Sequence, residues 1–401
     1  MSHDSVPSLP VPTRSEGLRR LEDMLPRAGQ PYATGRNHVP VPGGVPTTSL
    51  LSPYLRHRFV TEEEVVTAVV ERHGRDAEAF LKEVLWRTYW KGWLEMRPDV
   101  WRRYRSRVAT LARDADCMKR VEAAAAGRTG IACFDAWIAE MTETGSLHNH
   151  ARMWAASIWI FTLKLPWELG ADLFLRRLLD GDPASNTLSW RWVAGLHTPG
   201  KHYLARADVI HHCTNGRFSP EGLTEDAPPL TQSTSLPHPI APAEPVPVST
   251  ALPSVLLLTE EDLTPACLLP EGLEIRAGAI LSCVTARSPL PVAPGVRGFT
   301  QGALGNTLDR LGYSGGPSLP RDATAVLAWV RAHGAKQVVT PYAPVGPARE
   351  ALDSLEPALT AADIRLARPR RAWDADLWPL ATKGFFPFWQ QAADRIFGQK
   401  A

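Results

Sequence analysis

The sequence predicts an all-helical domain followed by a small α/β domain with a parallel sheet. Three observations support this prediction. Residues 14–212 place apolar side chains at three- and four-residue spacing with few internal Gly or Pro, as amphipathic helices do. Residues 219–253 are rich in proline and contain no aromatic residue. Beyond residue 253, short apolar runs alternate with helix-like stretches, which is typical of a parallel α/β sheet.

The helical domain is predicted over residues 1–218. Each of its clearest segments keeps apolar residues on one face, which must be buried against a neighbouring helix. These segments are Glu62–Arg72, Ala77–Met96, Ala132–Thr142, Arg152–Lys164 and Ala171–Leu179. A helical bundle is therefore expected.

Residues 219–253 are predicted to form an extended linker, because a proline-rich stretch without aromatic residues cannot bury a core. The second domain is predicted over residues 254–401. Its expected strands are Val255–Leu258, Gln337–Thr340 and Ile364–Leu366, and its expected helices are Thr324–His333 and Ala348–Ala361. This alternation predicts a small Rossmann-like domain.

Composition excludes several classes of protein. No apolar run is long enough to cross a membrane, and the polar, proline-rich segment Met1–Arg20 lacks the apolar stretch of a signal peptide. The five cysteines are widely spread, and no pair has metal-ligand spacing. We therefore expect a cytoplasmic protein with no metal site, no disulfide framework and no iron–sulfur cluster.

The net charge of +2 is unevenly distributed. Residues 1–218 carry 29 Lys and Arg against 24 Asp and Glu, whereas residues 219–401 carry 15 against 18. A polyanionic partner would therefore meet the first part of the chain. Random scatter of surface charge explains the same counts, so charge alone does not decide the partner.

Three hydroxyl residues, Thr48, Ser49 and Ser52, precede a predicted short helix. Ser52 is the expected N-cap, and Pro53 suits the first helical position. Hydroxyls and free N–H groups at a helix N-terminus can bind a pyrophosphate. The alternative is a capped helix without a ligand.

A second cluster lies on one predicted helix. Glu83, Trp86, Arg87 and Trp90 stand at positions i, i+3, i+4 and i+7, so they share a face. A carboxylate, an indole plane and a guanidinium on one face can hold a flat heterocycle. An ion pair beside two core aromatic residues is the alternative.

A third cluster combines residues 144–153 with residues 180–192, both dense in polar side chains among apolar helices. Burying such groups unpaired costs about 1–3 kcal/mol each, so they need partners. Either they pair with one another, Arg152 with Asp180 being the natural couple, or they bind a polar ligand.

Taken together, these motifs resemble the FAD-binding domain of DNA photolyases and cryptochromes. The resemblance rests on Thr-Gly-x-x-His-Asn-x-x-Arg-Met at 144–153, Asp-Gly-Asp-x-Ala-x-Asn-x-x-x-Trp-x-Trp at 180–192, Gly127–Gly130 with Phe134–Ala136, Thr-Ser-x-Leu-Ser-Pro at 48–53, Glu-x-x-Trp-Arg at 83–87, and Tyr32 with Arg36-Asn37. The motifs occur in the family's order and near its spacing. The match covers about half the chain, roughly residues 12–205.

The resemblance implies FAD as the cofactor and assigns a role to each matching position. It implies FAD binding by Tyr32, Thr48, Ser49, Leu50, Leu51, Ser52, Arg87, Asn149, Arg152, Asp180, Gly181, Asp182 and Asn186. It implies that Glu83, Trp86, Asn149 and His150 meet a pyrimidine lesion flipped out of DNA, with Asn186 facing the flavin N5. Trp190 and Trp167 match the inner members of the chain that reduces the photoexcited flavin. Because no tryptophan lies near Asp114, where the third member is expected, Trp159 is the candidate third member, with Trp154 as the alternative.

Several positions depart from the family pattern. His150 stands where enzymes acting on cyclobutane dimers usually have Arg, Thr88 follows Arg87 where an acid is usual, and the segment after Trp192 diverges. These departures indicate a divergent branch and leave the lesion type open.

The implied function is light-dependent repair of a pyrimidine photoproduct in damaged DNA, driven by an electron from photoexcited reduced FAD. This is the activity of a deoxyribodipyrimidine photolyase-type lyase. Two alternatives remain. One is a cryptochrome-like blue-light photoreceptor with a signalling partner, and the other is a helical scaffold with an empty, colourless pocket.

The predicted α/β domain resembles a shortened form of the antenna domain of this family. In ordinary members that domain comes first, whereas here it would follow the helical domain. The run Gly384–Trp389 resembles the Phe-Thr-Pro-Phe-Trp segment that ends the antenna domain. A permuted domain order is therefore expected. No Gly-x-Gly-x-x-Gly motif supports a dinucleotide site, and the presence of an antenna chromophore is left open.

Overall fold

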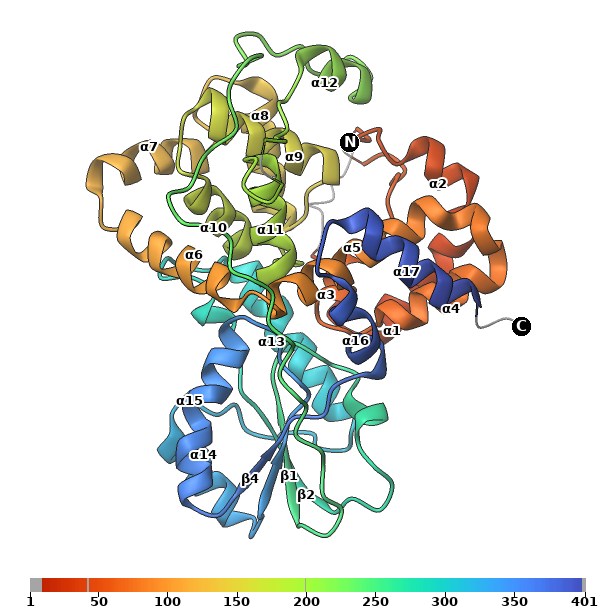
Figure 1. Ribbon diagram of the computed structural model, residues 1–401, viewed down its shortest axis with the longest axis vertical. Helices are drawn as coiled ribbons and strands as arrows, with labels where there is room; N and C mark the ends of the chain where they lie inside the picture. The colour runs from red at the N-terminus through yellow and green to blue at the C-terminus, as the bar shows by residue number, and fades with distance from the viewer. Residues whose placement is uncertain (1–8, 42, 199, 399–401) are drawn as a thin grey trace, which may run out of the picture.

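The computed structural model describes residues 9–41, 43–198 and 200–398, and the outermost residues of the two predicted domains lie outside this range. Figure 1 shows a large helical unit above a smaller α/β unit. The predicted fold class, helical followed by parallel α/β, is confirmed.

The helical unit begins with twelve α-helices in the described part of residues 9–213. They are α1 (Arg14–Met24), α2 (Gln30–Gly35), α3 (Ser52–Arg56), α4 (Glu62–His73), α5 (Glu78–Glu95), α6 (Pro98–Leu111), α7 (Ala115–Ala125), α8 (Ala132–Thr144), α9 (Asn149–Ser157), α10 (Trp167–Arg177), α11 (Pro183–Val193) and α12 (Ala207–Cys213). Local signals fix several of their ends. Thr61 and Glu64 form a capping box at α4, and Gly145 ends α8 in the left-handed conformation.

The predicted N-cap at Ser52 is wrong by one residue. Leu51 precedes α3 and already has helical dihedral angles, and no side chain caps the helix. The Ser49 hydroxyl accepts a 3.3 Å bond from the Leu51 N–H, which tightens the turn before α3. Ser52 and Pro53 therefore occupy the first two helical positions.

The α/β unit is built on a four-stranded parallel sheet of order β2-β1-β3-β4. Its strands are β1 (Ser254–Leu258), β2 (Ile275–Ile280), β3 (Gln337–Val339) and β4 (Arg365–Ala367). Its helices are α13 (Pro294–Arg310), α14 (Ala323–Ala332) and α15 (Pro347–Ala361). The three predicted strands correspond to β1, β3 and β4, and the two predicted helices to α14 and α15; β2 was not predicted.

The two faces of the sheet belong to different hydrophobic cores. Because side chains alternate along a strand, Val255 and Leu257 of β1 point to one face and pack in the cluster of α14 and α15. Leu256 and Leu258 point to the other face and join the large core that also contains α13 and the helical unit. The two units therefore share apolar packing.

Residues 219–253 run as irregular chain, first along the helical unit and then, from about residue 246, beside strands β3 and β4 of the sheet. The Leu230 N–H donates to the Ala194 carbonyl and the Ile240 N–H to the Met96 carbonyl, both at 2.9 Å. Arg103 on α6 donates to Thr234 and Ser235 in this segment. The predicted linker is thus anchored to the surface that it crosses.

The last two helices pack against the helical unit, although the predicted domain boundary placed them with the sheet. Figure 1 shows α16 (Ala372–Leu377) and α17 (Phe385–Gly398) lying beside α5. Phe385 stacks on Trp86 of α5 with ring centroids 3.7 Å apart. The α/β unit is therefore inserted into a helical unit that is built from both sides of it in the sequence.

Gly92 on α5 lets this helix approach the backbone of Trp378, which lies between α16 and α17. Replacement of Gly92 by alanine is expected to destabilise the protein by about 1–3 kcal/mol, as overpacking does. A Cβ at this position would lie 2.7 Å from the Cα and 2.9 Å from the carbonyl oxygen of Trp378. At Gly298 on α13, a Cβ would meet nothing within 4 Å. The matched Gly298→Ala variant should therefore gain about 1 kcal/mol from helix propensity. Urea unfolding of both variants measures the difference, and equal free energies of unfolding would contradict the close contact.

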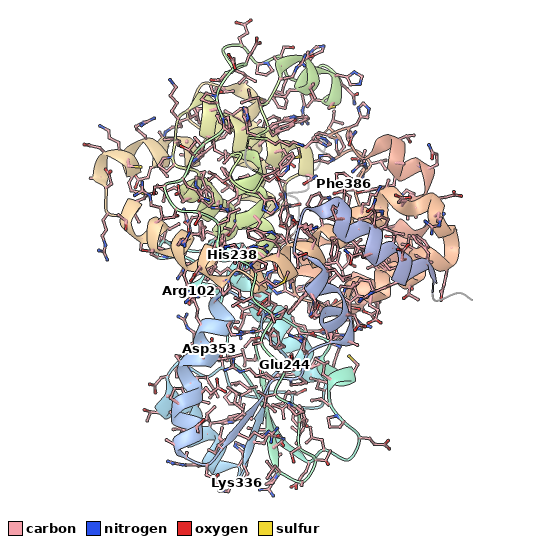
Figure 2. All side chains as sticks on the ribbon, viewed as in Figure 1. Arg102, His238, Glu244, Lys336, Asp353 and Phe386 are labelled. Carbon is pink, nitrogen blue, oxygen red and sulfur yellow. The ribbon has the colours of Figure 1, made fainter. Side chains whose placement is uncertain are left out.

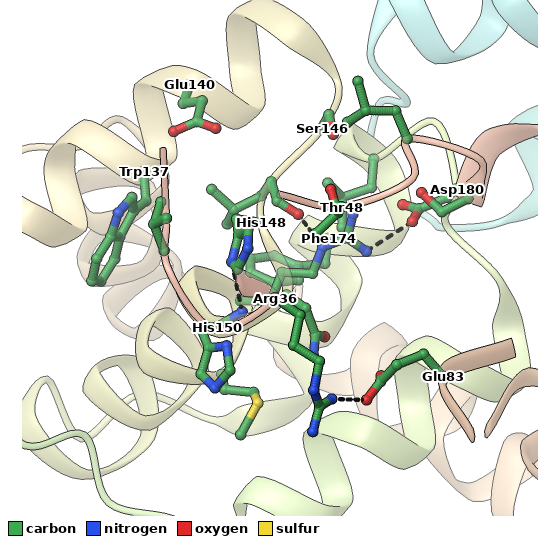
Figure 3. Close-up of a pocket in the computed structure, with 18 of the residues that line it drawn as sticks. Arg36, Thr48, Glu83, Trp137, Glu140, Ser146, His148, His150, Phe174 and Asp180 are labelled. Carbon is green, nitrogen blue, oxygen red and sulfur yellow. Dashed lines mark hydrogen bonds and ion pairs between the residues drawn. The ribbon is translucent and has the colours of Figure 1, made fainter. Parts of the chain in front are cut away.

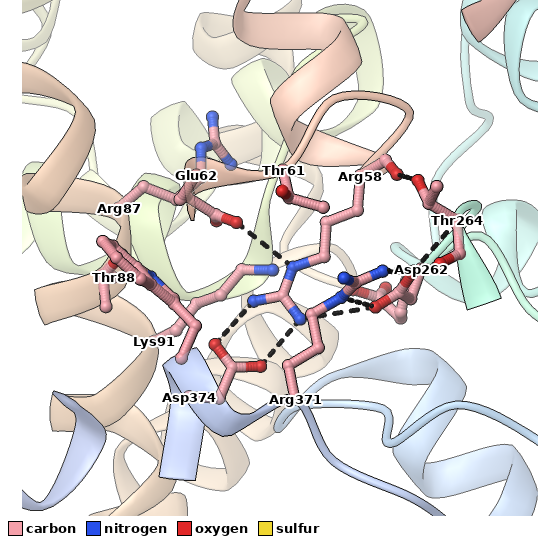
Figure 4. Close-up of polar contacts among 12 residues, drawn as sticks. Arg58, Thr61, Glu62, Arg87, Thr88, Lys91, Asp262, Thr264, Arg371 and Asp374 are labelled. Atoms are coloured by element: carbon pink, nitrogen blue, oxygen red, sulfur yellow. Dashed lines mark hydrogen bonds and ion pairs between the residues drawn. The ribbon is translucent and has the colours of Figure 1, made fainter. Parts of the chain in front are cut away.

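A buried polar seam joins the two units at the carboxyl end of β1 (Figure 4). Arg58 makes a bidentate pair with Asp374 at 2.7 Å, and Arg371 makes one with Asp262 at 2.6 and 2.8 Å. Arg56 pairs in the same way with Glu261 at 2.8 Å. Ligands of open α/β sheets usually bind at this edge, but here helical-unit side chains cover it. Lys336 lies at the opposite end of the sheet (Figure 2).

Among the described residues, no helix combines the length and apolar character that a bilayer crossing requires. Nor does this part of the chain bring three or more His, Cys, Asp or Glu side chains together in an arrangement that could bind a metal ion.

Candidate functional site

A cavity of about 1110 Å³ lies in the helical unit, bordered by α2, α3, α5, α8, α9 and α11 and by the irregular segment that precedes α3. Ligand pockets of proteins usually measure roughly 300–1,000 Å³, so this cavity suits a large ligand. Both polar and apolar side chains line its wall.

Most of the residues predicted to form the site line this single cavity. They are Tyr32, Thr48, Ser49, Leu50, Ser52, Glu83, Trp86, Arg87, Asn149, His150, Arg152, Asp180, Gly181, Asn186 and Trp190. The fold brings these residues together from five separate stretches of the sequence.

Leu51 and Asp182 lie behind the wall rather than on it. Leu51 is fully buried in the hydrophobic core. Asp182 caps α11 by accepting a 2.7 Å bond from the Ser185 N–H. Its carboxylate lies 3.6 Å from Lys91 and 3.8 Å from Arg87. Burial alone would raise the pKa of Asp182, but Lys91, Arg56 and Arg87 lower it well below its usual value. An ionised Asp182 therefore balances the cations beneath the cavity.

Arg152 and Asp180 form the pair expected from the sequence, with 3.0 Å between Nη1 and Oδ2 (Figure 3). Burial would raise the pKa of Asp180, but Arg152 and Arg87 lower it below its usual value. The second carboxylate oxygen, Oδ1, is buried and has no partner among the described residues. An ionised carboxylate with a free acceptor at the cavity wall can bind a donor on a ligand.

Arg36 and Glu83 form an ion pair at another part of the wall (Figure 3). Burial raises the pKa of Glu83, and Arg36 offsets only part of this effect. Trp86, one turn further along α5, lines the cavity while Phe385 stacks on its ring. Glu83 and Trp86, two of the four residues that the resemblance assigns to a DNA lesion, therefore already have partners within the protein.

His148 and His150 sit at the start of α9. The His148 Nδ1 accepts a 3.2 Å bond from the His150 N–H and so caps the helix. Burial, together with His150 and Arg152, lowers the pKa of His148 to about 4. Burial and the nearby Arg36 also lower the pKa of His150. Both imidazoles are thus neutral at pH 7, so position 150 lacks the positive charge that an arginine would provide.

Of the three tryptophans assigned to electron transfer, only Trp190 lines the cavity. Trp159 meets Trp190 edge to face, with ring centroids 6.3 Å apart. Trp167 lies near Tyr104 of α6, with 5.8 Å between the centroids. Trp159 therefore contacts Trp190 directly, whereas Trp167 contacts an aromatic residue of α6.

Sequence reasoning missed several residues of the wall. Trp137 and Glu140 of α8, three positions apart, face the cavity, as do Ser185 of α11 and Arg217. The three-residue spacing of Trp137 and Glu140 was the one available signal, and it is equally typical of an ordinary amphipathic helix. Ser185 is an unspecified position within the motif at 180–192, and Arg217 lies outside every motif named above.

The residues present fit FAD. Besides the size of the cavity, buried polar atoms without a partner among the described residues include Arg87 Nη1, Asp180 Oδ1 and Ser185 Oγ, all from residues that line it. Buried donors and acceptors are normally satisfied, so these atoms call for a polar ligand. Trp86, Phe174 and Trp190 supply apolar surface for a flat ring system.

Comparison with known proteins agrees with this arrangement. Residues 80–221 match the family model described as the FAD binding domain of DNA photolyase. Deoxyribodipyrimidine photo-lyase of Streptomyces griseus is 39% identical over 176 residues, which cover 41% of this chain and 38% of the relative. The photo-lyase of one strain of Thermus thermophilus is 34% identical over 229 residues, which cover 54% of this chain and 50% of the relative. The chain thus spans half or less of the length of these relatives.

Among solved structures, a bacterial class III photolyase from Agrobacterium tumefaciens is 29% identical, with a TM-score of 0.42 over 51% of this chain and 42% of the other.

Proposed function

We propose, on the premise that this chain belongs to the photolyase and cryptochrome family, that it is a light-dependent flavoprotein that repairs a pyrimidine photoproduct in DNA. One observation carries the proposal: most of the residues that match FAD-binding positions line the same cavity as those that match lesion-binding positions. A ligand flipped out of DNA could therefore reach the neighbourhood of a bound flavin.

The cofactor would be held by two groups of residues. Thr48, Ser49 and Ser52 offer hydroxyls for the phosphates, and Arg87, Arg152 and Asp180 offer charges for the flavin ring. When bound and reduced, FAD supplies the electron that light sends to the lesion. The protein contributes binding, orientation and the exclusion of water.

The remaining wall residues would receive the lesion. Glu83, whose raised pKa favours retention of a proton, would hydrogen-bond a carbonyl of the pyrimidine. Trp86 would offer the part of its ring that Phe385 leaves open. Asn186 donates to the Ala171 carbonyl at 2.7 Å, which fixes its side chain. In this position it would face the flavin N5.

Purified protein tests the proposal directly. Chemically reduced protein should be illuminated with DNA that carries either a cyclobutane dimer or a 6-4 photoproduct, and each lesion counted by chromatography. Light-dependent loss of one lesion is expected and names the substrate. A protein without bound flavin, or with flavin but no loss of either lesion, would contradict the repair proposal.

Glu83→Ala is expected to slow repair by about 10- to 100-fold, the effect of losing one hydrogen bond to a charged or polarised group in the transition state. FAD content should stay unchanged, because Glu83 pairs with Arg36 rather than with the phosphate-binding hydroxyls. Glu78→Ala is the matched control, since Glu78 lies on the same helix, pairs with Lys82 and is exposed. Single-turnover repair rates measure both. Equal rates in the two variants would remove Glu83 from the proposed lesion site.

A blue-light photoreceptor without repair is the second candidate, and one observation favours it. Glu83 and Trp86 are engaged by Arg36 and Phe385, so a lesion would have to displace these contacts or share them. A protein whose flavin is photoreduced while both lesions persist would support this alternative, with a signalling partner in place of DNA.

We also propose that the protein acts in the cytoplasm, on damaged DNA. The five cysteines, all within the described residues, form no disulfide. The excess of basic residues in positions 1–218 agrees with a polyanionic partner.

A further inference from the structure

We propose that Trp101 of α6 is the terminal electron donor of the chain that begins at Trp190, and that Glu350 of α15 accepts its indole proton. This inference rests on the proposed function, because it requires a bound flavin as the electron acceptor. It deepens that function by naming the outer end of the donor chain.

An aromatic path leads outward from Trp167. Its ring lies 5.8 Å from that of Tyr104, centroid to centroid, at an interplanar angle of 30°. Tyr104 in turn lies 5.3 Å from Trp101 at 38°. Tyr104 and Trp101 stand three residues apart on one face of α6, and Tyr104 contacts Trp167 at the start of α10. The three rings thus form a continuous series between two packed helices.

Gly170 connects this series to the cavity. A Cβ on Gly170 would lie 2.3 Å from the Trp190 ring, so this ring rests directly on the backbone of α10. Trp167 precedes Gly170 by three residues and lies on the same face of the helix. Arg191, the residue after Trp190, places its guanidinium 5.7 Å from the Trp167 ring centre. Trp167 is therefore the neighbour of Trp190 in the direction of α6.

Among the residues that the structure describes, the path through Trp159 has no comparable continuation. Beyond Trp159, the next ring is that of Phe134 at 6.5 Å, and phenylalanine is a poor electron donor. The Trp159 indole N–H donates to the Pro166 carbonyl at 2.9 Å. A backbone carbonyl cannot accept that proton to any useful extent. A positive charge on Trp159 would stay there and recombine.

Trp101 has the acceptor that Trp159 lacks. Its indole N–H donates to the Glu350 carboxylate at 2.7 Å, while the ring itself is buried, with 1% exposure. Glu350 is exposed at the start of α15, so it can exchange a proton with solvent. The two residues lie on opposite sides of the contact between the helical and the α/β units.

Tyr104 is suited to conduct charge but not to hold it. Its hydroxyl is buried and has no partner among the described residues. Burial and the nearby Asp172 raise the pKa of this phenol well above its usual value. Oxidised tyrosine is stable only after losing its proton, and here no described group is placed to receive it. The charge therefore moves on to Trp101.

The overall step is balanced in electrons and protons. One electron passes from Trp190 to the photoexcited flavin and is replaced in turn from Trp167, Tyr104 and Trp101. Trp101 loses one electron, and its Nε1 proton moves to Glu350, leaving a neutral indolyl radical and a protonated carboxyl group. An external thiolate then returns one electron to the indolyl radical and becomes a thiyl radical, while the proton on Glu350 moves back to Trp101 Nε1.

Trp101→Phe tests the donor role in the purified full-length chain with FAD bound and dithiothreitol as the thiol. We expect light-driven flavin reduction, followed by absorption, to slow by about tenfold or more, which corresponds to an energy difference of at least ~1.4 kcal/mol. Trp329→Phe, in the α/β unit, is the matched control and should behave as the wild type. Trp159→Phe should also reduce its flavin at the wild-type rate.

Glu350→Gln tests the proton acceptor without removing a buried ring. The amide oxygen preserves the hydrogen bond but is far less basic than a carboxylate. Transient absorption should then show a protonated indole radical in place of the neutral radical, and the separated charges should recombine about tenfold faster.

Three results separate the possible failures. Wild-type rates in both Trp101→Phe and Glu350→Gln, with flavin bound, would overturn this inference and leave the proposed function intact. Loss of photoreduction in Trp159→Phe alone would overturn it in favour of the other branch. A wild-type protein that binds no flavin would overturn the proposed function, and this inference with it.

Discussion

Asp262→Asn is expected to destabilise the protein by about 3–5 kcal/mol at pH 7, the usual effect of removing one partner from a buried ion pair. Asp262 is 2% exposed and accepts bonds of 2.6 and 2.8 Å from Arg371. Its carboxylate also lies 3.6 Å from Arg58. Asparagine keeps the shape but leaves two buried guanidinium groups with one negative charge fewer (Figure 4). Urea unfolding followed by circular dichroism measures the loss.

The size of this loss should depend on pH in a defined direction. Burial would raise the pKa of Asp262, but Arg371 and Arg58 lower it below its usual value in the folded protein. The Asp262 carboxylate therefore stabilises the folded protein fully at pH values above its pKa in the unfolded chain, about 3.9. This stabilisation is lost as the pH falls through the lower pKa that Asp262 has in the folded protein. The difference between wild type and Asp262→Asn should be largest near neutral pH and shrink below about pH 4.

Asp376→Asn is the matched control, because Asp376 lies on α16 beside the same seam but is exposed. Its free energy of unfolding should stay within about 0.5 kcal/mol of the wild type. A similar loss in both variants, or a pH-independent difference for Asp262→Asn, would show that the charge of Asp262 does not hold the seam together.

Asp180→Ala is expected to weaken FAD binding by about 10- to 100-fold, the contribution of a hydrogen bond to a charged group. Asp180 orients Arg152 at 3.0 Å and offers its unpartnered Oδ1 at the cavity wall. Without this carboxylate, Arg152 and Arg87 lose a common counter-charge. Quenching of flavin fluorescence on titration of the apoprotein gives the two dissociation constants.

Glu143→Ala serves as the control for charge at the cavity. Glu143 also lines the cavity but is exposed at its rim. Its replacement should change FAD affinity by no more than about twofold, as surface substitutions do. If both variants bind FAD equally well, the proposed contact between Asp180 and the flavin is excluded.

The sequence predicts those parts of the fold that depend on local signals. Helix α4 has a capping box and regular apolar spacing, and β1 and β3 are continuous apolar runs. Strand β2 was not predicted, because Arg276 and Gly278 interrupt its apolar pattern. The position of α17 could not be predicted, since the contact between Phe385 and Trp86 has no counterpart in the neighbouring sequence.

The same distinction applies to the candidate site. Clusters with helical spacing, such as Glu83 with Trp86, were placed on one face and do line the cavity. The pair between Arg152 and Asp180 followed from the need to satisfy buried polar groups. By contrast, the hydrogen bond between Trp101 and Glu350 joins residues 249 positions apart, so no spacing along the chain indicates it.

The return of the last helices to α5 also affects how the protein folds during its synthesis. The aromatic face of α5 around Trp86 and Tyr89 is covered by Phe385 and Phe388, which leave the ribosome roughly 300 residues later. At about 5–20 residues per second, this surface stays open for on the order of 15–60 s. The α/β unit, completed by β4, is translated in that interval. The aromatic side chains of α5 in the nascent chain thus stay exposed to solvent until translation is nearly finished. We therefore expect chaperones that act at the ribosome to bind this surface.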